Sequence, residues 1–274
     1  MRPLMKNKTK LFTLTLASVL AGALPASAAY EANYFRAWQG FKKSSLSDET
    51  FMRELPDFMK KTVDLYQNRA LNNYIVAIPP LEKPAYIPDE IALVALSSEE
   101  DYQSIRNTPE GKKYSARHWD IFDKNTSHSA KHLIDYNQER PDKLDSNWAY
   151  DMIGQPIDWS DGVNYVFIGV KKPNGSKGSF LERLKSHIEI ARETMEPKGL
   201  RGYIVIANEN YEIAFLNWES QISHDNAGVS KKGKVVFDDA NEFMDVLMYE
   251  SAAGFTAGKS ITYGKAYSTL QKGE

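Results

Sequence analysis

Apolar residues recur along the chain at two spacings, and together these predict a protein of mixed helices and strands. From about Asp48 to Gln67 the apolar side chains lie three and four positions apart, which is the spacing of one helix face. A second run with this spacing opens at a Ser179–Glu182 capping box and stops at Gly199. Short, dense segments rich in Ile, Val and Tyr lie between such runs and predict buried strands.

Two of these strand segments resemble each other. Leu71–Ile78 has the sequence LNNYIVAI, and Leu200–Ala207 has the sequence LRGYIVIA. Each is followed by a second strand, EIALV at 90–94 and EIAFL at 212–216, and is preceded by a strand and a helix. A match of several elements in the same order predicts an internal repeat.

Each copy is expected to end with a helix and a last strand. In the first copy Thr108 is the predicted cap of a helix that runs to about Phe122. In the second copy we predict a helix from Asp238 to about Tyr249 and a last strand from Ile261 to Tyr267. The order β-α-β-β-α-β is that of a ferredoxin-like unit, an antiparallel sheet with helices on one face. The predicted fold class is therefore α+β, with two tandem units.

The expected division of the chain follows from this repeat and from the turn residues between the copies. It comprises a cleaved signal peptide (1–28), a first repeat (29–136), a linker (137–162), a second repeat (163–268) and a polar tail (269–274).

The N-terminal segment is typical of a Sec-type signal peptide. Four basic residues precede the mainly apolar stretch Leu11–Leu24, and small residues end at Ala28. We expect cleavage after Ala28 and export to the periplasm or beyond. Since no later segment is long and apolar enough to span a bilayer, we expect no transmembrane anchor.

Composition narrows the possible chemistry. The 274 residues are 42% hydrophobic and include no cysteine, which excludes disulfides, thiol catalysis and thiolate-held metal centres. The formal net charge is −2, and loss of the four basic residues of the signal peptide would make it −6. A mildly acidic chain of this kind is not expected to bind nucleic acid.

The tandem β-α-β-β-α-β pattern resembles the dimeric α/β-barrel superfamily, which includes antibiotic-biosynthesis-monooxygenase-like domains. The resemblance covers roughly residues 34–135 and 164–267. It implies that the two antiparallel sheets face one another as an internal pseudo-dimer. Members of the group include cofactor-free oxygenases, haem-binding and haem-degrading proteins, and isomerases. No catalytic motif of the group is present residue for residue, so the resemblance assigns no site.

The first predicted strand supplies candidate ligand-binding residues. Alternation places Tyr34, Arg36 and Trp38 on one face and Phe35 and Ala37 on the other. The face that carries Arg36 could line the barrel interior, as an aromatic pocket with one positive charge for a planar, partly anionic molecule. Alternatively, Arg36 pairs with an acid on a neighbouring strand.

Trp218 ends the matching strand region of the second copy, and we expect it to face the same cavity.

His118 is the candidate catalytic residue. It lies on the inner face of the helix that begins at Pro109, where it could act as an acid or base or as an axial ligand. The alternative is a core histidine bonded to a backbone carbonyl.

His128 and His132 are spaced so that a helix would place both imidazoles on one face, as a metal site requires. The more common outcome is a pair of exposed histidines. No cofactor is required by the sequence, and haem or a divalent metal held by His118, His128 and His132 stays an alternative.

The leading functional hypothesis is an exported protein that binds a small, partly hydrophobic organic ligand, with oxygenase-like or isomerase-like chemistry if it is an enzyme. The alternative is a non-catalytic envelope protein that contacts a protein partner. A hollow between the sheets would favour the ligand, and a closed core there would favour the partner. The oligomeric state stays open.

Overall fold

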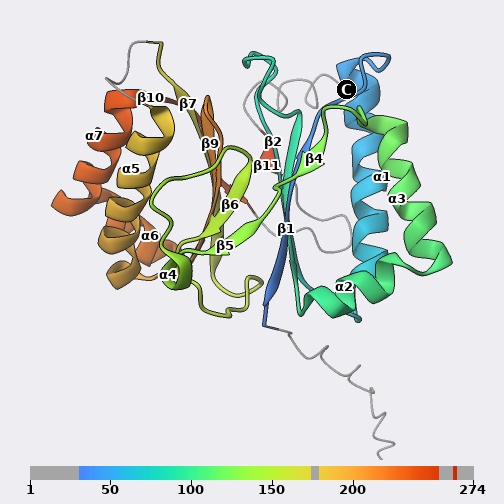
Figure 1. The fold of residues 1–274 in the computed structure, drawn as a ribbon, viewed down its shortest axis with the longest axis horizontal. Coiled ribbons are helices and arrows are strands. Elements are labelled where there is room, and N and C mark those ends of the chain that lie inside the picture. Colours follow the sequence, from blue (N-terminus) through green and yellow to red (C-terminus); the bar gives the residue numbers. More distant parts are fainter. Residues whose placement is uncertain (1–30, 174–178, 253–261, 264–274) are drawn as a thin grey trace, which may run out of the picture.

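The computed structural model describes residues 31–173, 179–252 and 262–263, which form two sheets lying face to face with helices on both outer sides (Figure 1). The predicted signal peptide and tail lie outside the described residues. Within the described part, no helix is long and apolar enough to cross a membrane.

The first half is a ferredoxin-like unit. Its elements are β1 (Tyr34–Gly40), α1 (Asp48–Tyr66), β2 (Leu71–Ile78), β3 (Glu90–Leu96), α2 (Glu99–Arg106), α3 (Pro109–Ile121) and β4 (His128–Ser129). The strands lie in the order β2-β3-β1-β4, and every neighbouring pair among them is antiparallel.

The second half repeats this arrangement. Its elements are β7 (Val163–Lys171), α5 (Phe180–Met195), a short 3-10 helix (Glu196–Lys198), β8 (Leu200–Ala207), β9 (Tyr211–Trp218), α6 (Gln221–Val229), α7 (Lys231–Phe243) and β10 (Met244–Ala252). The order β10-β7-β9-β8 matches that of the first half. The predicted α+β class with two tandem ferredoxin-like units and facing sheets is confirmed.

Three further strands extend the two sheets. Within the segment 137–162, which we predicted to be a linker, β6 (Trp148–Asp151) pairs with β8. The strand β5 (Leu133–Asp135) lies parallel to β6, and α4 (Tyr136–Glu139) connects them. The strand β11 (Thr262–Tyr263) crosses to the first half and lies parallel to β2. The segment between the repeats is therefore part of the second sheet.

Local capping signals set the helix starts as predicted. The side chains of Ser47 and Thr108 accept hydrogen bonds from Thr50 N and Gly111 N and so begin α1 and α3. Ser179 and Glu182 form the capping box at the start of α5.

The predicted end of the second copy is wrong. The last helix begins at Lys231 and stops at Phe243, and the residues from Met244 on form β10, which pairs with β7. A bulge between Val246 and Met248 shifts the strand's alternation, so its apolar residues imitate helical spacing in the sequence. The predicted strand at 261–267 is described only as β11, and its other residues lie outside the described part.

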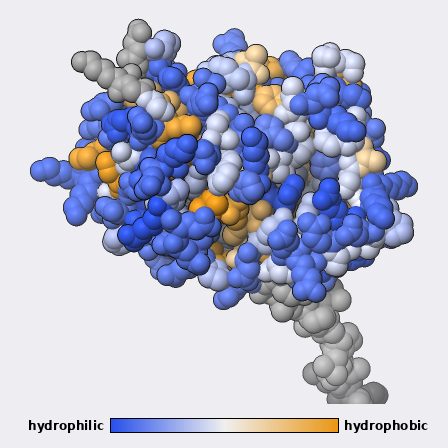
Figure 2. Space-filling view, in the orientation of Figure 1, coloured by the Kyte–Doolittle hydropathy of each residue, from blue (hydrophilic) through white to orange (hydrophobic). Residues whose placement is uncertain are grey.

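The space between the sheets is a closed apolar core. Phe35, Ala37 and Trp159 pack there against the β-branched side chains that both sheets direct inward. Most of these side chains are fully buried, so the two halves share one continuous core. Figure 2 shows a mainly hydrophilic outer face, with an apolar patch where the halves meet and another over α5 and α7.

Candidate functional site

A cavity of about 280 Å³ lies in the first half, between its sheet and the helices α1, α2 and α3. We call it the first-half cavity. Its polar and charged lining residues are Arg36, Thr62, Tyr66, Tyr74, Tyr102, Arg106, Tyr114, Ser115, His118, Ser127, His128 and Ser129. Trp38, Phe58, Ala92, Val94 and Trp119 complete the wall, so the cavity combines aromatic surface with several hydrogen-bonding groups.

The face of β1 that carries Arg36 and Trp38 lines this cavity, not the barrel interior that we had considered. The opposite face, with Phe35 and Ala37, packs between the sheets. Alternation correctly separated the two faces. Because β1 is covered on both sides, alternation alone could not decide which face meets the helices.

Arg36 is held in place within the cavity wall. Its guanidinium donates to the Ser129 hydroxyl at 2.6 Å and lies over the Tyr102 ring, 5.3 Å from the ring centre. Neither partner carries a negative charge, so the positive charge of Arg36 is oriented but not neutralised by them. Arg106 is exposed at the end of α2 and adds a second guanidinium to the same wall. Nothing in the sequence distinguishes Arg106 from other charged residues at helix ends, which are common.

His118 lies among aromatic rings in the first-half cavity, as its position on α3 predicted. Its ring centre is 4.7 Å from that of Phe58, 4.9 Å from that of Tyr114 and 5.2 Å from that of Trp38. Burial lowers the pKa of His118 to about 4, so the ring is neutral at physiological pH. The ring is bonded to a backbone carbonyl, as in a core histidine, and it also lines the cavity. Its role as an acid, a base or an axial ligand stays a prediction.

The hydrogen bond of His118 fixes its tautomer. Its Nδ1 lies 3.3 Å from the Tyr114 carbonyl oxygen, which can only accept, so Nδ1 carries the proton. In the neutral ring Nε2 is then the acceptor. The cavity thus contains a neutral imidazole able to take up a proton.

His128 also lines the first-half cavity. Its tautomer is fixed by a chain of hydrogen bonds that begins at Tyr211 in the second half. The Tyr211 hydroxyl donates to Gln39 Oε1 at 2.6 Å, and the Gln39 amide donates to His128 Nε2 at 3.1 Å. His128 Nδ1 in turn donates to the Thr126 carbonyl at 2.8 Å. Gln39 is fully buried, so this chain of bonds joins the two sheets through their core.

The predicted metal pair does not fall on a helix. His128 lies in β4, where both ring nitrogens are hydrogen-bonded, whereas His132 follows the strand and packs against the Trp148 ring at 4.4 Å. Among the described residues, no group of three His, Asp or Glu side chains is arranged to hold a metal ion. The donor sets of His118, His128 and His132 therefore do not fit a shared metal.

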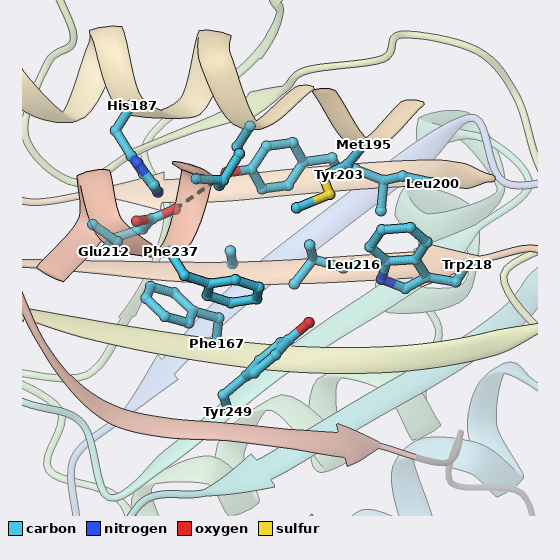
Figure 3. Close-up of a pocket in the computed structure, with 14 residues that line it drawn as sticks. Phe167, His187, Met195, Leu200, Tyr203, Glu212, Leu216, Trp218, Phe237 and Tyr249 are labelled. Carbon is cyan, nitrogen blue, oxygen red and sulfur yellow. Dashed lines mark hydrogen bonds between the residues drawn. The ribbon is translucent and has the colours of Figure 1, made fainter. Parts of the chain in front are cut away.

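The two remaining candidates, Tyr34 and Trp218, lie elsewhere. Tyr34 lines a separate groove of about 450 Å³ that it shares with Arg36. Trp218 lines a cavity under the helices of the second half (Figure 3), so it does not share a site with Arg36 as we had expected. The two halves hold separate cavities because each sheet packs its outer face against its own helices.

Comparison with known proteins gives matches at the level of three-dimensional structure. No family model matches the sequence, and neither does any curated protein. A proposed monooxygenase from Fusobacterium nucleatum is 15% identical, with a TM-score of 0.44 over 81% of this chain and 95% of that protein.

A proposed monooxygenase from Lactobacillus acidophilus is 10% identical, with a TM-score of 0.42 over 84% of this chain and 96% of that protein. An anthrone oxidase-like protein is 14% identical, with a TM-score of 0.38 over 83% and 94%. Similarity at these identities and TM-scores does not assign a reaction to this chain.

Proposed function

We propose that this protein binds a small, planar organic acid in the first-half cavity. The observation that carries the proposal is the convergence of Arg36, Arg106 and a neutral His118 on one aromatic-lined cavity. Aromatic walls bind a planar molecule through its faces and edges, and an oriented guanidinium binds a carboxylate or an ionised phenol.

The partial burial of the Arg36 charge favours an anionic ligand over an uncharged one. Arg36 is half-buried, and its uncharged partners are the hydroxyls of Ser129 and Tyr34 and the ring of Tyr102. A bound anion would neutralise this charge in a region of low dielectric, where the attraction is stronger than in water. An uncharged ligand of the same shape would displace water from the guanidinium without replacing the lost interaction.

His118 gives the same cavity a proton acceptor. A bound molecule with an acidic O–H or C–H group directed at Nε2 could transfer its proton to the imidazole. Oxygenase-like and isomerase-like reactions of organic acids can both begin with such a deprotonation. We therefore propose His118 as the base if the protein is an enzyme.

The closed core between the sheets is the feature that we expected to favour a protein partner. The hollow that a ligand needs is present instead between the sheet and the helices of the first half. This cavity supports the ligand hypothesis over the partner hypothesis. We further propose that the protein acts after export, as the predicted signal peptide implies.

Isothermal titration calorimetry with salicylate and its uncharged ester, methyl salicylate, tests the proposal. We expect salicylate to bind at least tenfold more tightly than the ester. Arg36→Met should abolish this preference, since methionine replaces the aliphatic part of the arginine side chain but carries no charge. The matched control is Arg53→Met, because Arg53 is exposed on α1 and its ion pair among the described residues is with its exposed neighbour Glu54 at 3.4 Å. Equal binding of acid and ester to the unmodified protein would overturn the proposal.

A further inference from the structure

The second half holds a cavity at the place that corresponds to the first-half cavity. Glu90 of β3 pairs with Gly40 of β1, and Glu212 of β9 pairs in the same way with Gly169 of β7. Both glutamates are buried within the matched EIA strings of the repeat. The second-half cavity, of about 60 Å³, lies between this sheet and the helices α5 and α7 (Figure 3).

The lining of the second-half cavity differs in charge from that of the first. None of its lining residues, all of which are described, is an arginine or a lysine. Its histidine, His187, is bonded to Asp239 at 2.9 Å, and Asp239 also pairs with Arg183. An anion would therefore meet no available cation there, so the cavity suits an uncharged molecule.

Two buried polar atoms, in residues that line this apolar space, have no hydrogen-bond partner among the residues that the structure describes. They are Oε2 of Glu212 and Nε1 of Trp218, whose residues are 1% and 2% exposed. Figure 3 shows the two side chains toward opposite ends of the cavity. The other carboxyl oxygen of Glu212 accepts a bond from the Tyr203 hydroxyl at 3.4 Å. A buried polar group without a hydrogen bond destabilises the fold, so a ligand that supplies the missing bond gains binding energy.

Both unsatisfied atoms can act as donors. The indole nitrogen of Trp218 is a donor only. Burial raises the pKa of Glu212 to about 8, so the carboxyl is mostly protonated at neutral pH and offers its O–H. The complementary ligand is one that carries an acceptor oxygen.

We propose that the second-half cavity binds a small, uncharged, mainly apolar carbonyl compound whose oxygen accepts a hydrogen bond from Trp218 or Glu212. The cavity is smaller than the ~150 Å³ cavity that accommodates benzene, so the ligand has only a few heavy atoms unless side chains move. This site goes beyond the proposed function, because it uses none of the residues of the first-half cavity.

Nuclear magnetic resonance of the tryptophan side chains tests this site, with butanone as the probe. Trp218→Phe identifies the indole N–H signal of Trp218. We expect that signal to shift and to saturate as butanone is added, while the signal of Trp159, buried between the sheets, stays in place. Propionate, which has the same size but a charge, and 2-methylbutane, which has no acceptor, should shift it at least tenfold less. Absence of a shift with butanone, or an equal shift with propionate, would overturn the proposal.

Variants localise the binding. Ala240→Leu fills the cavity from α7 and should weaken butanone binding at least tenfold, whereas Ala116→Leu on the exposed side of α3 should leave it unchanged. Glu212→Gln keeps a donor and should stay within threefold of the unmodified protein, and Glu212→Met should lose at least fivefold. Unchanged affinity in both Ala240→Leu and Glu212→Met contradicts the site. Arg36→Met should not alter butanone binding, so the two proposals fail separately.

Discussion

His118 shows how one residue joins a structural role to a chemical one. Its Nδ1 satisfies a backbone carbonyl of its own helix, while its ring contacts three aromatic side chains of the cavity wall. The surrounding rings lower its pKa because they exclude the water that would stabilise the charged form. The same feature makes the imidazole a free acceptor at neutral pH.

The lowered pKa of His118 predicts a loss of stability in acid. Between pH 6.5 and about 4 the unfolded chain takes up a proton at this residue and the folded chain does not, so folding is progressively weakened as the pH falls. The loss is on the order of 2–3 kcal/mol. Chemical denaturation from pH 7 to pH 4 measures it, and His118→Gln should remove this component. An identical pH profile in His118→Gln would contradict the lowered pKa of His118.

The buried glutamates have the opposite dependence. Burial raises the pKa of Glu212 to about 8. The unfolded chain therefore releases this proton above pH 4.5, while the folded chain keeps it until about pH 8. Stability is then greatest below pH 4.5 and falls as the pH rises to 8. Glu90 has the same direction and cause.

Glu212→Gln should therefore stabilise the protein increasingly toward alkaline pH. Relative to the unmodified chain, its free energy of unfolding is expected to gain about 3 kcal/mol between pH 5 and pH 8. Urea unfolding at the two pH values tests this, and the exposed Glu49→Gln on α1 is the matched control. A constant difference between Glu212→Gln and the unmodified protein would contradict a protonated Glu212.

At the scale of elements, the turn between α2 and α3 positions His118. Thr108 begins α3, and Gly111 packs so closely on the end of α2 that a Cβ atom would lie 2.3 Å from the Ile105 carbonyl oxygen. The second half has the same arrangement. Ser230 begins α7, and a Cβ atom on Gly233 would collide with the Ala227 carbonyl. A cap followed by a glycine thus sets the angle between the two helices in each half.

Gly111→Ala should destabilise the protein by about 1–3 kcal/mol, because the added methyl group forces the two helices apart. The displacement of α3 should also weaken ligand binding near His118. Lys112→Ala changes an exposed neighbour on the same helix and should stay within about 0.5 kcal/mol of the unmodified protein. Thermal unfolding measured alongside salicylate titration checks both effects, and full stability in Gly111→Ala would contradict the close packing.

At the scale of the whole molecule, the two halves are joined by a shared core and by the bond chain from Tyr211 through Gln39 to His128. The strand β11 adds a further link, since it leaves the second half and pairs with β2 of the first. The halves nevertheless keep separate cavities under their own helices. Two cavities whose linings differ in charge therefore lie in halves that share one core.

Export is a prediction for the whole chain. Cleavage after Ala28 would give a protein that begins at Ala29, with a formal net charge of −6. Expression of the full sequence in a host with a Sec pathway, followed by intact mass measurement of the periplasmic fraction, tests this. Ala26→Lys should block processing, since signal peptidase requires small residues before the cleavage point. A full-length mass in the soluble cytoplasmic fraction would contradict export.

The local signals in the sequence determined the repeat, most of the helix boundaries and the two faces of β1, because apolar spacing and capping act between near neighbours. They also identified Arg36, Trp38 and His118, which the fold brings to one cavity. They misplaced the end of the second copy, where the bulge in β10 imitates a helical period.

Only the tertiary structure decided that the space between the sheets is closed and that the cavities lie beneath the helices. A strand that is buried on both faces carries no local mark of which neighbour covers each face. The separation of Trp218 from Arg36, and the unsatisfied atoms that face Trp218's cavity, depend on contacts between residues far apart in the chain. Such contacts are set by the packing of whole elements, which no short pattern in the sequence encodes.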